Sequence, residues 1–170
     1  TATAPRLEYW ETSFDLPVEA DLKSAMGGQI ALGNFNYRHA TIAVNLVGTA
    51  LAKCDDQGST SCYGNGFAEY TLLNSGPSRF RNWDGTSVSL DFGVGRIEHA
   101  KALATERLIT NPPSSSDEQL LSAYVKREFM GRPLDGHYRL RIWDSGKLDW
   151  NKLEDVQFVL RYHYWTRFSD

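Results

Sequence analysis

The amino-acid sequence predicts a mainly β fold, an antiparallel β-sandwich that carries an insertion of one or two helices at about residues 96–130. Three observations lead to this prediction. Apolar and polar residues alternate in two runs near the end of the chain, shorter alternating runs follow one another in the first half, and a stretch with helical spacing separates these two regions. Alternation indicates strands because successive side chains of a strand point to opposite faces of its sheet.

The two runs near the end of the chain are the clearest strand candidates. The first places three apolar residues on one face: Tyr138, Leu140 and Ile142. The second places five on one face: Val156, Phe158, Leu160, Tyr162 and Tyr164. Both runs are rich in β-branched and aromatic residues, which suit a pleated and half-buried surface. We therefore expect both runs to be core strands of the sandwich.

The first half of the chain supplies the remaining strands. Residues 5–17 predict an extended segment in which Tyr9 and Trp10 pack on the core, and residues 18–27 fit either a short helix or an edge strand. Further strand candidates are 37–52, 66–74 and 87–94, and residues 74–87 between the last two have the composition of a loop.

The helical insertion rests on a change of period. Apolar and alanine residues fall at helical spacing in 96–110, and Asn111-Pro112-Pro113 then stops the pattern. A second helix is expected over 114–129, where Ser115 and Glu118 fit a capping box.

Length and charge limit the functional classes. A chain of 170 residues is expected to be a single domain, 1–170, that buries its own core. Its net charge of −3 argues against nucleic acid as a partner, since such domains are usually basic. No apolar run has the length of a membrane span, and the first residues lack a signal-peptide pattern. A mature form, an excised domain and a cytosolic protein all stay open as alternatives.

Two cysteines, Cys54 and Cys62, flank a short polar loop. A disulfide between them would destabilise the unfolded chain by about 2.5 kcal/mol and would imply an oxidising compartment. The alternative is two free thiols.

The end of the chain resembles a known class of module. The segments GRPLDGHYRLRIWD and LEDVQFVLRYHYWTR are similar to strands of jelly-roll, galactose-binding-like domains and, more narrowly, to β-sandwich domains in the A-subunit-like proteins of bacterial toxin complexes. The resemblance covers about residues 94–168. It implies a jelly roll that is part of a larger secreted or cell-surface protein. It also implies a non-catalytic interaction module that binds a receptor, a partner subunit or a glycan, with no catalytic residues.

A search for catalytic chemistry agrees with a non-enzymatic role. None of the four histidines lies in a metal-binding array, and no serine or cysteine lies in a nucleophile motif. A small hydrolase with an unrecognised site stays open as the less favoured alternative.

Acidic residues around the last loop offer oxygen ligands. Asp144, Asp149 and Asp155 lie close in sequence, and calcium binds such groups. The resemblance also implies a structural calcium ion, since jelly-roll modules often carry one. The alternative is that these acids are simply solvated, and no other cofactor is expected.

Aromatic residues in polar loops suggest a ligand site. Trp83, Trp150 and Tyr63 lie in such loops, and Asp149 is next to Trp150. Exposed aromatic rings beside polar groups are suited to stacking on a sugar or to a protein interface. These four residues are the predicted ligand-binding candidates, and a lectin-like carbohydrate-binding domain is the alternative to a protein-binding module.

Overall fold

The computed structural model describes residues 8–16, 34–51, 68–144 and 148–166. The elements in this part of the chain are, in order, β1 (Tyr9–Leu16), β2 (Asn34–Val47), β3 (Glu69–Ser75), β4 (Pro77–Arg81), β5 (Ser87–Asp91), β6 (Gly95–Lys101), β7 (Leu103–Thr105), α1 (Ser115–Leu121), β8 (Gly136–Trp143), the 3-10 helix η1 (Trp150–Lys152) and β9 (Asp155–Thr166). Residues 18–27, one of the predicted elements, lie outside the described ranges.

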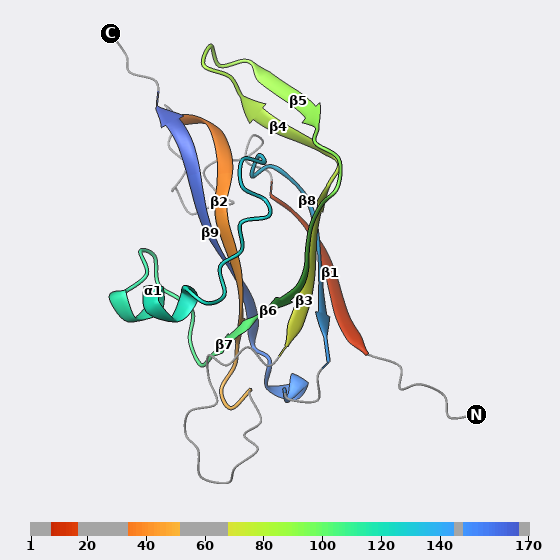
Figure 1. The fold of residues 1–170 in the computed structure, drawn as a ribbon, viewed down its shortest axis with the longest axis vertical. Coiled ribbons are helices and arrows are strands. Elements are labelled where there is room, and N and C mark those ends of the chain that lie inside the picture. Colours follow the sequence, from red (N-terminus) through yellow and green to blue (C-terminus); the bar gives the residue numbers. More distant parts are fainter. Residues whose placement is uncertain (1–7, 17–33, 52–67, 145–147, 167–170) are drawn as a thin grey trace, which may run out of the picture.

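Two sheets pack face to face and enclose the core (Figure 1). One sheet has the strand order β1-β8-β3-β6 and the other the order β7-β2-β9, while β4 and β5 form a separate hairpin at one end. Buried side chains from both sheets form one cluster, in which Val44 of β2 meets Leu72 of β3 and Leu140 of β8. The predicted mainly β fold with a small helical insertion is confirmed.

The two strands predicted most clearly lie in different sheets. β8 has a partner on each side, and its predicted inner face is fully buried at Tyr138, Leu140 and Ile142. β9 lies at the edge of the other sheet and pairs with β2 alone among the described strands. Its predicted inner face also packs against the core, through Val156 and Phe158 among others.

The helix predicted over 96–110 is wrong, because β6 and β7 occupy these residues. Ile97 and Ala100 are buried and three residues apart, which resembles a helical period. The spacing results from a β-bulge: Ala100 is opposite Tyr70 and Ile97 is opposite Leu72, so β6 uses one more residue than β3. His99 in the bulge has a φ of 52°.

β6 and β7 form an almost continuous extended run that belongs to both sheets. β6 is antiparallel to β3 at the edge of the four-stranded sheet. β7 begins two residues after β6 ends and pairs in parallel with β2 in the three-stranded sheet. The run therefore crosses from one sheet to the other along one side of the sandwich (Figure 1).

Two further predictions need correction. The loop predicted over 74–87 contains β4, which pairs with β5. A proline at the first residue of the edge strand β4 is compatible with pairing, since that position needs no inward N–H. The capping box is also displaced by one residue: Ser114 caps α1, and its partner is Asp117.

α1 is shorter than predicted and ends at Leu121. After it the chain pairs with β2 through an antiparallel bridge between Lys126 and Ile42, which uses backbone groups that a longer helix would need. Leu121 and Tyr124 pack against the outer face of the β2 sheet at Ala43. Among the described residues, no helix has the length and apolar character required to cross a membrane.

Candidate binding site

The best candidate for a ligand site is a pocket of about 510 Å³, which we call the aromatic pocket. Its walls come from the start of β1, the residue after β8, and η1 with the residue that follows it. The lining residues are Glu8, Tyr9, Trp10, Asp144, Trp150 and Leu153. The pocket is therefore lined by three aromatic and two acidic residues.

Tyr9 and Trp10 are more exposed than the sequence predicted. Both were expected to pack on the core, but 49% of Tyr9 and 40% of Trp10 is accessible to solvent. The reason is their position, because they begin β1, which is the edge strand of its sheet. They are available to a ligand for the same reason.

The ring of Tyr9 is held by its neighbours on the outer face of the sheet. Trp143 is its partner in register, and the two rings meet edge to face with centroids 5.2 Å apart. The guanidinium of Arg141 lies 4.2 Å from the centre of the Tyr9 ring and donates two hydrogen bonds to Glu11, at 2.9 and 2.7 Å. This network fixes the Tyr9 ring on the outer face. Trp10, the next residue, is opposite the buried Ile142 and therefore points to the other face of the sheet.

Trp150 forms the opposite part of the pocket. η1 is capped by Asp149, whose Oδ1 accepts from the backbone N–H of Asn151 at 3.2 Å. The Trp150 ring is partly buried against the core, and its buried indole N–H has no acceptor among the described residues. A buried donor without an acceptor is costly. Because this nitrogen is shielded from solvent, Trp150 contributes its ring rather than its N–H to the pocket.

The pairing of β1 with β8 brings the two acidic residues of the pocket, Glu8 and Asp144, close to each other. The backbone N–H of Asp144 donates to the carbonyl of Glu8 at 2.8 Å and extends the pairing of β1 with β8 by one residue. Because the two residues lie on adjacent strands, both contribute to the same pocket.

Gly48 allows the loop that carries Trp150 to approach β2. A Cβ atom at Gly48 would lie 2.0 Å from the carbonyl oxygen of Lys152, the last residue of η1. Only glycine permits this approach. Gly48 therefore marks a close contact between two segments of the chain.

The structure separates the predicted ligand residues. Trp150 lines the aromatic pocket, whereas Asp149 next to it caps η1. Trp83 is 65% exposed, as predicted, but lies in the turn between β4 and β5 at the other end of the molecule (Figure 1). Tyr63, Cys54 and Cys62 lie outside the described residues.

Glu8, Tyr9 and Trp10 were not predicted as site residues. The available signal was the run Glu-Tyr-Trp-Glu near the start of the chain, which places two aromatic residues between two acids. Their link to Asp144 and Trp150 depends on pairing between distant segments, which the local pattern does not specify.

Two of the predicted calcium ligands bond to backbone N–H groups. The carboxylate of Asp149 caps η1, and Asp155 Oδ1 accepts from the N–H of Val156 at 2.7 Å. Asp144 lines the aromatic pocket. In the described part of the chain, no group of three or more acidic, histidine or cysteine side chains is arranged to hold a metal ion. Calcium binding at these residues stays a prediction.

The hydrolase alternative has one arrangement to consider. Asp15, His137 and Ser75 are register neighbours on β1, β8 and β3, and His137 Nδ1 lies 2.9 Å from Asp15 Oδ1. This order resembles that of a catalytic triad. However, no hydrogen bond joins Ser75 to His137, and both His137 and Asp15 are exposed side chains. The arrangement therefore gives little activation of the serine.

Comparisons of the chain with protein-family models, with curated proteins and with solved structures found no match. The resemblance of residues 94–168 to toxin-complex domains stays a prediction.

Proposed function

We propose that this chain is a non-catalytic binding module and that the aromatic pocket binds a carbohydrate. The observation that carries the proposal is the joint presence of Tyr9, Trp10 and Trp150 with Glu8 and Asp144 around a pocket of about 510 Å³. This volume is in the usual range for sites that hold small ligands, roughly 300–1,000 Å³.

The chemistry of the pocket matches the two kinds of surface on a sugar. The C–H faces of a pyranose ring are apolar and stack on aromatic rings, which also tolerate partial contact with water. Its hydroxyl groups can donate to the carboxylates of Glu8 and Asp144. A neutral sugar fits this set of groups better than an anion, because the lining residues include two acids and no cation.

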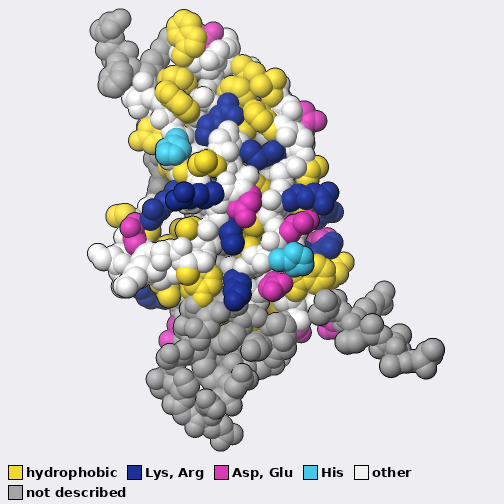
Figure 2. Space-filling model, in the orientation of Figure 1, with side chains coloured by type: hydrophobic (Ala, Val, Ile, Leu, Met, Phe, Trp, Pro, Cys, Tyr) yellow, Lys and Arg dark blue, Asp and Glu magenta, His cyan; other side chains and the backbone are white. Residues whose placement is uncertain are grey.

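A second candidate function is binding to a receptor or partner subunit through the opposite end of the molecule. Hydrophobic side chains gather around the end that carries the β4–β5 hairpin (Figure 2). Trp83 in the hairpin turn is 65% exposed, and Tyr164 and Trp165 near the end of β9 are 48% and 49% exposed. Exposed aromatic residues of this kind are enriched at protein interfaces.

The wider setting that we propose comes from the resemblance of residues 94–168. It is a larger secreted or cell-surface bacterial protein of the toxin-complex type, in which this module provides attachment and turns over no substrate.

A glycan array tests the carbohydrate proposal, with the purified chain applied in calcium and in chelator. We expect binding to a restricted set of glycans. Changing Trp10→Ala should weaken that binding about fivefold or more, since stacking contributes on the order of 1 kcal/mol or more. Trp83→Ala is the matched control, because it removes an exposed tryptophan at the other end and should leave glycan binding unchanged.

Each of the other possible results of this experiment would contradict a different part of the proposal. An array without binding would reject the carbohydrate proposal and favour the partner protein, for which Trp83→Ala should then reduce binding. Glycan binding that survives Trp10→Ala would place the sugar outside the aromatic pocket. Binding lost in chelator would support calcium, whereas unchanged binding would separate the sugar site from any metal.

A further inference from the structure

The outer edge of β9 is the side of this strand that is turned away from β2. β9 pairs along one edge with β2, from Asn34–Thr166 to Val47–Asp155. Along its other edge it has no strand partner in the described part of the chain. An unpaired strand edge presents a row of backbone donors and acceptors that another extended segment can use.

The hydrogen bonds of β2 identify the open groups on β9. Ile42 exchanges both its backbone bonds with Lys126, at 3.0 and 2.7 Å, so its N–H and C=O point away from β9. Leu160 is opposite Ile42 in register. In an antiparallel pair such a residue also points its backbone groups away from its partner, and the pattern repeats every second residue. The N–H and C=O groups of Phe158 and Leu160 therefore face the open edge.

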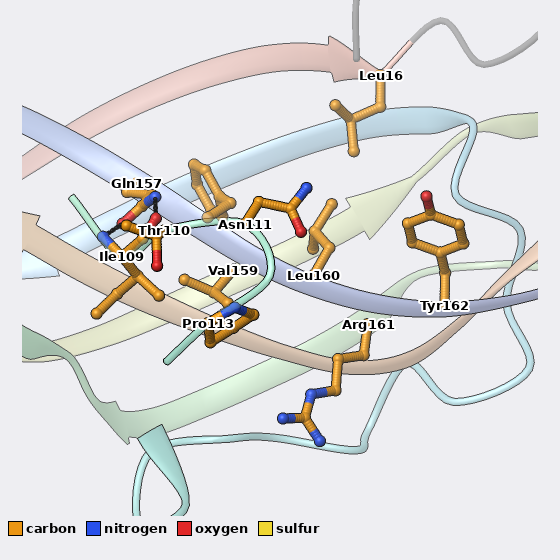
Figure 3. Close-up of a pocket in the computed structure, with 11 residues that line it drawn as sticks. Leu16, Ile109, Thr110, Asn111, Pro113, Gln157, Val159, Leu160, Arg161 and Tyr162 are labelled. Atoms are coloured by element: carbon orange, nitrogen blue, oxygen red, sulfur yellow. Dashed lines mark hydrogen bonds between the residues drawn. The ribbon is translucent and has the colours of Figure 1, made fainter. Parts of the chain in front are cut away.

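A groove of about 460 Å³ runs beside these groups, and we call it the β9 groove (Figure 3). β9 contributes residues from both of its faces, and Leu16 at the end of β1 adds an apolar side chain. The segment from Ile109 to Pro113 lies beside β9 as well. Among the described residues that line the groove, Arg161 alone is charged.

The side chain of Gln157 holds the segment that begins at Ile109, so the backbone of β9 takes no part in these bonds. Its side-chain amide accepts from the N–H of Ile109 at 2.8 Å and donates to the carbonyl of the same residue at 2.9 Å. The amide of Asn45, which is fully buried, donates to the same Gln157 oxygen at 3.2 Å and orients the side chain. The groove beside the edge is thus held in place by a buried network, while no described strand pairs with the edge itself.

We propose that the β9 groove binds an extended peptide segment of a partner protein, which adds a strand to the sheet. The backbone of the segment bonds to Phe158 and Leu160. An apolar side chain of the segment packs against Leu16, and an acidic side chain bonds to the guanidinium of Arg161, whose present partner is Glu118 at 2.7 Å. Strand addition takes its affinity from main-chain bonds and its specificity from alternate side chains.

The shape of the groove favours a peptide over a second copy of the chain. Leu16 and the Ile109–Pro113 segment lie beside the edge, so a single extended strand fits where a folded domain would meet these residues first. The site is separate from the aromatic pocket, with which it shares no lining residue. Its test is therefore independent of the carbohydrate proposal.

A displayed library of random nine-residue peptides is the probe. We expect the selected peptides to alternate apolar and polar residues and to contain Asp or Glu. In amide NMR spectra of the full chain, the largest shifts on binding should occur at Phe158, Leu160 and their neighbours. N-methylation of the peptide at residues that face β9 should weaken binding at least tenfold, whereas N-methylation at the alternate residues should have little effect.

Two exposed arginines provide a matched pair of variants. Arg161→Ala should weaken the binding of acidic peptides several-fold. Arg139→Ala, on the outer face of the other sheet, should leave their binding unchanged. The proposal is wrong if the library yields no binder, if binding is insensitive to the position of N-methylation, or if the shifts map elsewhere. It is also wrong if the chain forms dimers through β9 that peptides do not displace, since a second copy would then be the occupant.

Discussion

His39 Nε2 and Tyr138 Oη lie 2.8 Å apart inside the sandwich and join its two sheets. The Tyr138 hydroxyl donates to the carbonyl of Leu134 at 2.7 Å, so its oxygen is left to accept from His39. His39 therefore carries its proton on Nε2 and is neutral. Burial, assisted by the charge of Arg132, lowers the pKa of His39 from its usual 6.5 to about 4.

This pKa shift predicts that the protein loses stability in mild acid. An unfolded chain binds a proton at His39 below about pH 6.5, and the folded chain does so only below about pH 4. The contribution of neutral His39 to the free energy of unfolding is thus fully present above pH 6.5. It is lost as the pH drops from 6.5 to about 4, and it amounts to about 3 kcal/mol. Urea unfolding at a series of pH values measures it.

His39→Gln is the variant for this test, because glutamine can still donate to Tyr138 but does not titrate. We expect its free energy of unfolding to depend less on pH than that of the unchanged chain, by about 2 kcal/mol between pH 6.5 and 5. His163→Gln, at an exposed position on β9, should keep the original dependence. Equal slopes for all three proteins would contradict the assignment.

Gly48 predicts a second effect on stability. Gly48→Ala places a methyl group where the Lys152 carbonyl lies, and we expect a loss of about 1–3 kcal/mol as the two segments separate. Thr49→Ala, at the exposed neighbouring position, should change stability by less than about 0.5 kcal/mol. Thermal unfolding of both variants makes the comparison.

The same change reaches the aromatic pocket, because η1 carries Trp150. Gly48→Ala should therefore reduce glycan binding even at temperatures where the protein stays folded. If the variant is as stable as the unchanged chain, the close approach of Gly48 and Lys152 does not exist in solution.

Two adjacent serines test which residue begins α1. The hydroxyl of Ser114 accepts from the N–H of Asp117 at 3.2 Å, and the carboxylate of Asp117 accepts from the N–H of Ser114 at 3.3 Å. Ser114→Ala should cost about 1 kcal/mol of stability, as the loss of a helix cap usually does. Ser115→Ala lies inside the helix and should be almost neutral. Urea unfolding measures both losses. If Ser115→Ala costs more stability than Ser114→Ala, the capping box first expected from the sequence is correct.

The prediction of the fold from the sequence succeeded where one residue pattern decided the structure. Tyr138, Leu140 and Ile142 alternate without interruption, and all three are buried in β8. The prediction failed at Ile97 and Ala100, since the bulge at His99 adds a residue and the alternation is lost. A strand with a bulge and an alanine-rich helix then share the same local spacing.

The candidate site was predicted in part, for a different physical reason. Trp150 was recognised because an aromatic residue in a polar loop is visible locally. Glu8 and Trp10 were not, because their role depends on β1 pairing with β8, a contact between the two ends of the chain. The exposure of Trp10 also depends on its position. It is an apolar residue of the kind expected in a core, but it lies on the edge strand of its sheet.

The extended run formed by β6 and β7 has a mechanical consequence. Because this single length of chain is hydrogen-bonded into both sheets, pulling the sheets apart must break backbone bonds of at least one of them and cannot proceed by sliding apolar surfaces alone. The run therefore links the two sheets along one side of the sandwich. Among the described strands, none joins the opposite edges, β1 and β9, so we expect a force applied to the module to open it first on the side where the β9 groove lies.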